Sequence, residues 1–80
     1  MPFTYILYSA DIDRYYSGST GGSLEDRLVK HLQNHSGFTS KAKDWKIVYA
    51  KESETIKAAM NLESKIKKRG ARRYLDDLRD

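Results

Sequence analysis

The hydrophobic and polar positions along the chain predict three strands. Phe3 to Tyr8 is rich in aromatic and branched residues, which is typical of a strand. Turn-forming residues follow, and Arg14 to Ser19 predicts a second strand, so the two should form an antiparallel hairpin. Trp45 to Ala50 alternates well enough to predict a third strand.

The facing of two tyrosines depends on the hairpin loop. With an even number of loop residues, for example with Tyr8 opposite Asp13, Tyr5 lies directly opposite Tyr16. Directly opposed residues point to the same face of a sheet. An odd loop or a bulge would separate the two side chains, because a slip of one residue reverses facing. Gly18 indicates either a close backbone approach or such a bulge.

A helical period begins after two glycines. Ser23 is the expected N-cap, with an acidic residue three positions later, and the helix should end near Ser36-Gly37. Its predicted core stripe recurs every four residues, at Leu24, Leu28 and Leu32. Arg27 and His31 form a second stripe beside the first and can reach the edge of the sheet.

A longer helix is predicted from Ser53, a good N-cap, to Gly70, a C-terminal stop. Glu63 falls on its apolar face, where a carboxylate without a partner is costly. The apolar positions at helical spacing are Ile56, Ala59, Met60 and Ile66. A short last helix is supported by Tyr74, Leu75 and Leu78. The predicted fold is α+β, a small three-stranded antiparallel sheet flanked by helices, in the order β-β-α-β-α-α.

The length and composition bound the class of protein. Eighty residues are expected to form a single domain, residues 1–80, with a small core. There is no cysteine, which is compatible with a reducing compartment. No apolar run approaches the ~20 residues of a membrane span, and the N-terminus lacks the features of a signal peptide. A cytoplasmic location is therefore expected.

The charge is concentrated near the end of the chain. The formal net charge of +4 points mildly to an anionic partner. Six basic residues fall within nine positions: Lys65, Lys67, Lys68, Arg69, Arg72 and Arg73. This cluster can contact phosphates. On charge alone, a solvated helix face is about as good an interpretation.

Each candidate residue also has a purely structural interpretation. Strand tyrosines usually serve packing. Arg27 can pair with a neighbouring acid, and a histidine beside a leucine stripe is more often a boundary residue than a catalyst. Together, however, two tyrosines, an arginine, a histidine and a glutamate are side chains that a metal-dependent phosphodiester nuclease can use.

The combination resembles the GIY-YIG nuclease family over nearly the whole chain. The family's first motif falls at Phe3-Thr4-Tyr5 and its second at Tyr16-Ser17-Gly18. The positions that match its helical arginine, its frequent histidine and its metal-binding glutamate are, in order, Arg27, His31 and Glu63. In particular, the chain looks like the small single-domain bacterial members related to the N-terminal nuclease domain of excinuclease C.

The chain departs from the family pattern at three places. Phe3 and Thr4 replace glycine and isoleucine in the first motif. Ser17 stands in the second motif where a branched apolar residue is usual. Several nucleases of the family carry an asparagine after the glutamate helix, and no residue after Asn61 fills that place.

The resemblance implies that water cleaves a phosphodiester bond with the help of Mg²⁺ or Mn²⁺. Glu63 would hold the metal, since these cations prefer oxygen ligands, and Arg27 would hold the scissile phosphate. Tyr16 or Tyr5 would orient or deprotonate the water, and His31 would relay a proton or contact the phosphate. The basic cluster would hold the nucleic acid without reading its sequence.

The expected activity is that of a DNA endonuclease guided by DNA structure and linked to repair or recombination. One alternative is a non-catalytic nucleic-acid-binding module on the same scaffold, which the absent asparagine favours. Another is a small adaptor that docks on a protein, although no long exposed apolar stripe recommends it. A monomer and a homodimer are both compatible with the sequence, and a homodimer would bring two sites to the two strands of a duplex.

Overall fold

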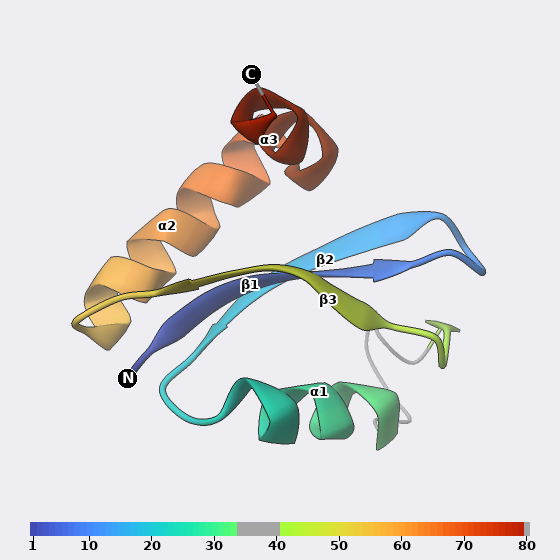
Figure 1. Cartoon of the computed structure of the whole chain (residues 1–80), viewed down its shortest axis with the longest axis horizontal. Helices are drawn as coiled ribbons and strands as arrows, with labels where there is room; N and C mark the ends of the chain where they lie inside the picture. The colour runs from blue at the N-terminus through green and yellow to red at the C-terminus, as the bar shows by residue number, and fades with distance from the viewer. Residues whose placement is uncertain (34–40, 80) are drawn as a thin grey trace.

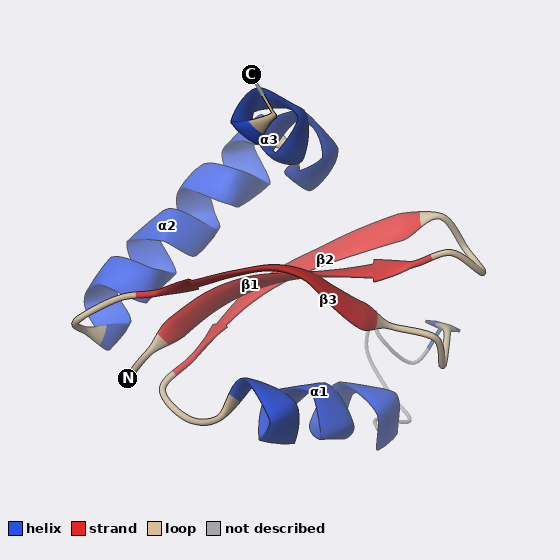
Figure 2. Ribbon diagram, viewed as in Figure 1, coloured by secondary structure: helices blue, strands red, loops and turns tan. Residues whose placement is uncertain are grey.

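The structure, a computed structural model, describes residues 1–33 and 41–79, apart from the side chains of His31 and Gln33. The elements in chain order are β1 (Phe3–Ser9), β2 (Arg14–Thr20), α1 (Leu24–Gln33), β3 (Lys46–Glu52), α2 (Ile56–Arg69) and α3 (Ala71–Leu78). The predicted α+β class and element order are thus confirmed (Figure 2). Within the described ranges, no helix is long and apolar enough to span a bilayer.

The three strands form one antiparallel sheet in the order β2-β1-β3. Strand β1 therefore lies in the centre and β2 at one edge. Helix α1 covers one face of the sheet, and α2 and α3 lie over the other (Figure 1). Because helices lie on both faces, side chains from either side can reach the edge strand β2.

The hairpin between β1 and β2 has an even loop. Ser9 pairs with Arg14, which leaves four loop residues, 10–13. Asp13 adopts a left-handed conformation with φ 50°, and its carboxylate accepts a hydrogen bond of 2.8 Å from the Tyr8 hydroxyl. Asp13 therefore belongs to the turn, and the turn is centred one residue further along the chain than a Tyr8–Asp13 pair would place it.

The register that results keeps the two tyrosines on one face but does not oppose them directly. Tyr5 pairs with Gly18, and Tyr16 pairs with Leu7. The predicted direct opposition of Tyr5 and Tyr16 is wrong by two positions. Facing repeats every two residues, so both side chains still point to the same face. The β1–β2 register is continuous, so Gly18 does not form a bulge.

The centre of the core is supplied by β1. Residues 4–7 are each at most 1% exposed. Tyr5 and Leu7 form a cluster with Trp45, and the predicted stripe of Leu24, Leu28 and Leu32 packs against that cluster. On the opposite face, the Thr4 hydroxyl donates a hydrogen bond of 2.7 Å to the Ala59 carbonyl oxygen in α2. The alternation of β1 thus fixes one helix layer on each face.

Helix α1 begins where the sequence predicts. The Ser23 hydroxyl accepts a hydrogen bond of 3.4 Å from the Asp26 amide, which is the expected N-cap contact. The predicted end near Ser36-Gly37 lies outside the described residues. The third strand overlaps its predicted range and carries a bulge at Val48, where the register with β1 shifts.

Helix α2 starts later than predicted. Its N-cap is Thr55, whose hydroxyl accepts a hydrogen bond of 3.1 Å from the Ala58 amide. The predicted N-cap Ser53 is wrong, because its amide donates a hydrogen bond of 2.8 Å to the Pro2 carbonyl oxygen and stays with the strands. Both residues are suitable caps by type, so the pairing of the strand end decides between them.

Only part of the predicted apolar stripe of α2 is buried. Ala59 and Ile66 are fully buried, as expected. Ile56 and Met60 are 45% and 55% exposed, so these two apolar positions at helical spacing do not join the core. A sheet of three strands covers only a narrow stripe of a helix, and these two residues lie beside it. Gly70, with φ 92°, ends α2 at the predicted place, and the predicted short last helix follows as α3.

Candidate active site

The candidate site lies along β2, at the edge of the sheet. One part of it comes from the α1 face and joins Tyr5 to Arg27. The other part comes from the α2 face and joins Ser19 to Glu63. Successive residues of a strand point to opposite faces. Gly18 therefore faces the α1 part of the site, and Ser19 faces the α2 part.

Gly18 leaves the space that the Tyr5 ring occupies. A Cβ atom at Gly18 would lie 2.5 Å from the Tyr5 hydroxyl oxygen and 2.7 Å from its Cζ atom. The close approach predicted for this glycine is therefore present, and the group that approaches is a tyrosine ring. The ring runs past the Gly18 backbone, and its hydroxyl oxygen accepts a hydrogen bond of 3.2 Å from Nε of Arg27.

Both partners of the Tyr5–Arg27 contact are protonated at neutral pH. Burial raises the pKa of Tyr5, and the neighbouring Arg27 guanidinium opposes that change only in part. The same hydrogen bond raises the pKa of Arg27. The contact uses Nε of Arg27 and does not involve its two terminal nitrogens. A guanidinium held in this way can bind a phosphate through two donors.

Glu63 is held by two contacts, one on each carboxylate oxygen. Oε1 accepts a hydrogen bond of 2.6 Å from the Ser19 hydroxyl, and Oε2 forms a 2.6 Å ion pair with Nζ of Lys67. Partial burial alone would raise the pKa of Glu63. The hydrogen bonds from Lys67 and Ser19 outweigh it and hold this pKa below its usual value. Glu63 is thus an ionised carboxylate at neutral pH, with a side chain 20% exposed.

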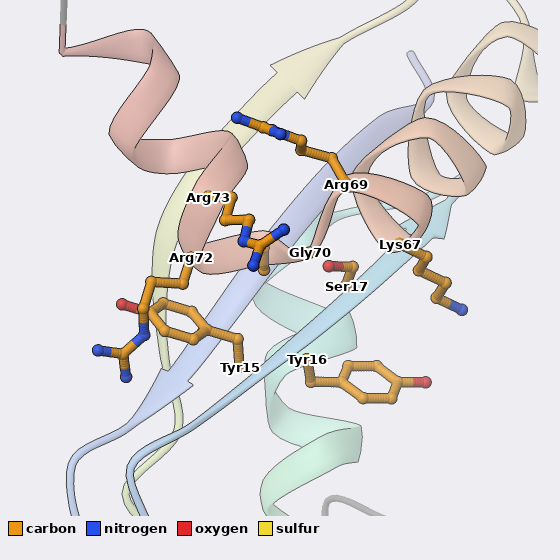
Figure 3. Close-up of a pocket in the computed structure, with 9 residues that line it drawn as sticks. Tyr15, Tyr16, Ser17, Lys67, Arg69, Gly70, Arg72 and Arg73 are labelled. Carbon is orange, nitrogen blue, oxygen red and sulfur yellow. The ribbon is translucent and has the colours of Figure 1, made fainter.

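The two halves of the site share one electrostatic environment. The charge of Glu63 acts on both Tyr5 and Arg27 from across β2. Tyr16 in turn acts on Arg27 and Lys67. Figure 3 shows the Tyr16 ring projecting from β2 on the same side as the Lys67 side chain. A carboxylate, a guanidinium and two phenols therefore converge on one edge.

A family model of the GIY-YIG catalytic domain matches residues 1–75, which is nearly the whole chain. The chain belongs to the GIY-YIG family. Its fold is therefore a nuclease-type fold, as the motifs around Tyr5 and Tyr16 predicted. No curated protein and no solved structure matches the chain.

In this GIY-YIG domain the structure brings together four of the five predicted catalytic residues: Tyr5, Tyr16, Arg27 and Glu63. His31 lies in α1 one turn after Arg27, and its side chain lies outside the described part. The predicted site did not include the contacts of Ser19 and Lys67 with Glu63. The spacing of four residues between Glu63 and Lys67 was a signal for an ion pair on one helix face.

The predicted basic cluster of the GIY-YIG domain divides into two groups. Four members line a groove beside β2, namely Lys67, Arg69, Arg72 and Arg73. Lys65 and Lys68 are exposed and do not line it. Within the groove, Arg69 binds Asp77 through two hydrogen bonds of 2.9 and 3.0 Å, and Arg72 pairs with Asp13 at 3.0 Å.

GIY-YIG nucleases generally depend on a divalent metal, and Glu63 is the candidate ligand. Among the described residues there is no cluster of three or more acidic, histidine or cysteine side chains. A single ionised carboxylate at a partly exposed edge nevertheless fits Mg²⁺ or Mn²⁺, which retain several waters and also bind phosphate oxygens. The fit requires Lys67 to share Glu63 or to move from it.

Proposed function

We propose that this protein is a metal-dependent endonuclease that hydrolyses phosphodiester bonds in DNA, guided by DNA structure and acting in repair or recombination. The observation that supports this best is the ionised carboxylate of Glu63, held within the field of Arg27 and Tyr5 at an exposed sheet edge. A basic groove borders that edge. Such a groove can hold a nucleic-acid backbone without reading bases.

Arg27 binds the scissile phosphate in this proposal. Its charge and its terminal nitrogens suit a phosphate that gains negative charge as the reaction proceeds. Tyr5 acts as a positioning residue, because its hydroxyl holds Nε of Arg27 and so orients the guanidinium. Gly18 serves the same end by leaving room for the Tyr5 ring.

Tyr16 is the better candidate to orient or deprotonate the attacking water. Burial raises the pKa of Tyr5 and makes its hydroxyl a poor base at neutral pH. Tyr16 lies closer to the edge, is only half-buried and is within the electrostatic reach of Arg27. The role predicted for His31, a proton relay or a phosphate contact, remains part of the proposal.

Glu63 would hold Mg²⁺ or Mn²⁺, with the Ser19 hydroxyl orienting the carboxylate. When bound, such a metal supplies positive charge to the phosphoryl group and the leaving oxygen. The Lys67 ammonium stands at the same carboxylate, and it would either share Glu63 with such a metal or turn to neighbouring phosphates.

A non-catalytic nucleic-acid-binding module is the second candidate. The ion pair between Glu63 and Lys67 favours it, because a lysine that neutralises the carboxylate competes with a metal. In that case the groove and the edge would bind DNA, and no cleavage would follow.

The proposal is tested with end-labelled single-stranded, flapped, nicked and branched DNA in Mg²⁺ or Mn²⁺ and in a chelator. We expect metal-dependent cleavage of at least one structure by the wild type. Arg27→Gln should lower the rate by about a hundredfold or more. The matched control is Arg14→Gln, since Arg14 is exposed on β2 and hydrogen-bonds only its neighbour's carbonyl oxygen among the described residues.

Binding without cleavage by the wild type would favour the second candidate. Equal loss of cleavage in the two arginine variants would contradict the role of Arg27.

A further inference from the structure

The groove on the α2–α3 side of β2 contains features that phosphate binding does not require. Its lining includes Tyr15, Tyr16 and the hydroxyl-bearing Ser17 from β2, opposite the corner between α2 and α3. The Tyr15 ring belongs to this face, whereas the Tyr16 ring points to the α1 face and borders the groove at its edge. Figure 3 shows Tyr15 beside Arg72 at one end and Tyr16 with Lys67 at the other. The groove therefore opens at one end onto the candidate active site.

Two small residues keep the helix side of this groove open. Gly70 and Ala71 form the corner between α2 and α3. A Cβ atom built at Gly70 would meet no other atom within 4 Å. The space beside the corner is therefore open.

The charges around the groove favour an anionic occupant. Lys67, Arg69 and Arg72 each have an acidic partner. Arg73 has no ion pair in the part of the chain that the structure describes, and Figure 3 shows it over the middle of the groove. The Arg72 guanidinium lies over the Tyr15 ring, 5.5 Å from its centroid. Aromatic rings mixed with cations are typical of surfaces that bind single-stranded nucleic acid.

We propose that this groove binds an unpaired nucleotide of the strand whose neighbouring phosphodiester lies at the Glu63–Arg27 edge. An unpaired base offers a flat apolar face for the surface formed by Tyr15, Gly70 and Ala71, and its phosphate meets Arg73. A duplex presents mainly phosphates to a protein surface, and its paired bases are not available to fill an apolar groove. This inference rests on the proposed function for the identity of the strand, and it assigns the structural preference to flaps or other unpaired ends.

The test uses fluorescence anisotropy with a labelled duplex that carries a short single-stranded flap and with the same duplex without a flap, in a chelator. Ala71→Trp fills the groove without a change of charge. Asn61→Trp is the control: Asn61 is exposed and does not line the groove. We expect Ala71→Trp to weaken flap binding by roughly tenfold, the scale of one lost base-stacking contact. Duplex binding should remain unchanged, and Asn61→Trp should bind both DNAs like the wild type.

A second pair of variants keeps the test valid if Ala71→Trp folds poorly, which circular dichroism would reveal. Arg73→Gln should weaken flap binding several-fold, and Lys68→Gln should not. Lys68 is a suitable control because it follows the buried Ala59 by nine positions, about two and a half helical turns, and so faces away from the sheet.

Equal effects on flapped and plain duplex, or equal effects of Arg73→Gln and Lys68→Gln, would overturn the inference. If the wild type cleaves DNA in a metal-dependent way but Ala71→Trp binds the flap like the wild type, the groove does not bind the unpaired nucleotide. The proposed nuclease activity would then still hold. If Ala71→Trp weakens flap binding but the wild type cleaves no substrate, the groove binds the unpaired nucleotide and the proposed nuclease activity is contradicted.

Discussion

At the scale of single residues, the candidate site depends on the lack of a side chain at Gly18 as well as on the side chains of its polar residues. Gly18 matters because a Cβ there would overlap the Tyr5 hydroxyl. The family motifs identified Tyr5, Tyr16, Arg27 and Glu63 from the sequence, because their residue types and spacing are specific. The sequence indicated a close approach at Gly18 but not that the Tyr5 ring makes it, and it did not indicate the contact of Ser19 with Glu63. Both depend on which strand residues stand opposite the ring and the carboxylate.

Gly18→Ala should displace Tyr5 and with it Arg27. The ring is 1% exposed and has little room to move, so we expect a loss of about 1–3 kcal/mol in the free energy of unfolding. Cleavage should fall sharply as well. Urea denaturation and single-turnover cleavage are the measurements. Gly22→Ala is the control, because a Cβ there meets its nearest atom only at 4.0 Å. Equal behaviour of the two variants would show that the Tyr5 position is not critical.

Lys67→Met should strengthen metal binding at Glu63. The ion pair of 2.6 Å places a cation on Oε2, and its removal leaves a carboxylate without that competitor. We expect Mn²⁺ to bind several-fold more tightly, as measured by electron paramagnetic resonance or calorimetry. Lys68→Met, on the outward face of α2, should bind Mn²⁺ like the wild type. Unchanged affinity in Lys67→Met would show that Glu63 is not the metal ligand.

At the scale of elements, patterns predicted the strands and helices well but misjudged where they begin and how they pair. The sequence allowed either an even or an odd hairpin loop, and the conformation of Asp13 set the turn. The N-cap of α2 was predicted at Ser53 but is Thr55. Both residues carry a hydroxyl group, so residue type alone does not distinguish between them. The contact from the Ser53 amide to Pro2 joins distant segments and leaves no local signal.

Thr55→Ala should destabilise the domain through the loss of its cap. The Thr55 hydroxyl accepts the Ala58 amide at 3.1 Å, and such a loss costs about 1 kcal/mol. Ser53→Ala should cost less, because Ser53 contributes a backbone amide that alanine retains. Chemical denaturation of the two variants gives the comparison. A larger loss in Ser53→Ala would contradict the assigned cap.

At the scale of the whole molecule, the site exists because β2 is an edge strand between two helix layers. Arg27 reaches it from α1 and Glu63 from α2, on opposite faces of the sheet (Figure 1). The order β2-β1-β3 was not evident from hydrophobic periodicity, since periodicity gives the elements and their faces but not the neighbours of each strand. The pairing of Glu63 with Ser19 follows from that order, and so does the groove next to it.

The paired carboxylate links the stability of the whole domain to pH. The folded state holds the pKa of Glu63 below its usual value of 4.5. Glu63 therefore contributes stability above that value, and the contribution is lost as the pH falls through the lowered folded-state pKa. The free energy of unfolding should fall more steeply below about pH 4.5 in the wild type than in Glu63→Gln. Denaturation series from neutral to acid pH measure this, and parallel curves would contradict the account of Glu63.

The role of Glu63 as the metal ligand is tested by single-turnover cleavage of the preferred DNA structure by the wild type, Glu63→Gln and Glu54→Gln, with binding measured in parallel. Glu54 is an exposed glutamate outside the site. We expect Glu63→Gln to bind the DNA but to cleave it at least about a hundredfold more slowly, and Glu54→Gln to cleave at the wild-type rate. Equal metal-dependent cleavage by all three proteins would contradict the role of Glu63.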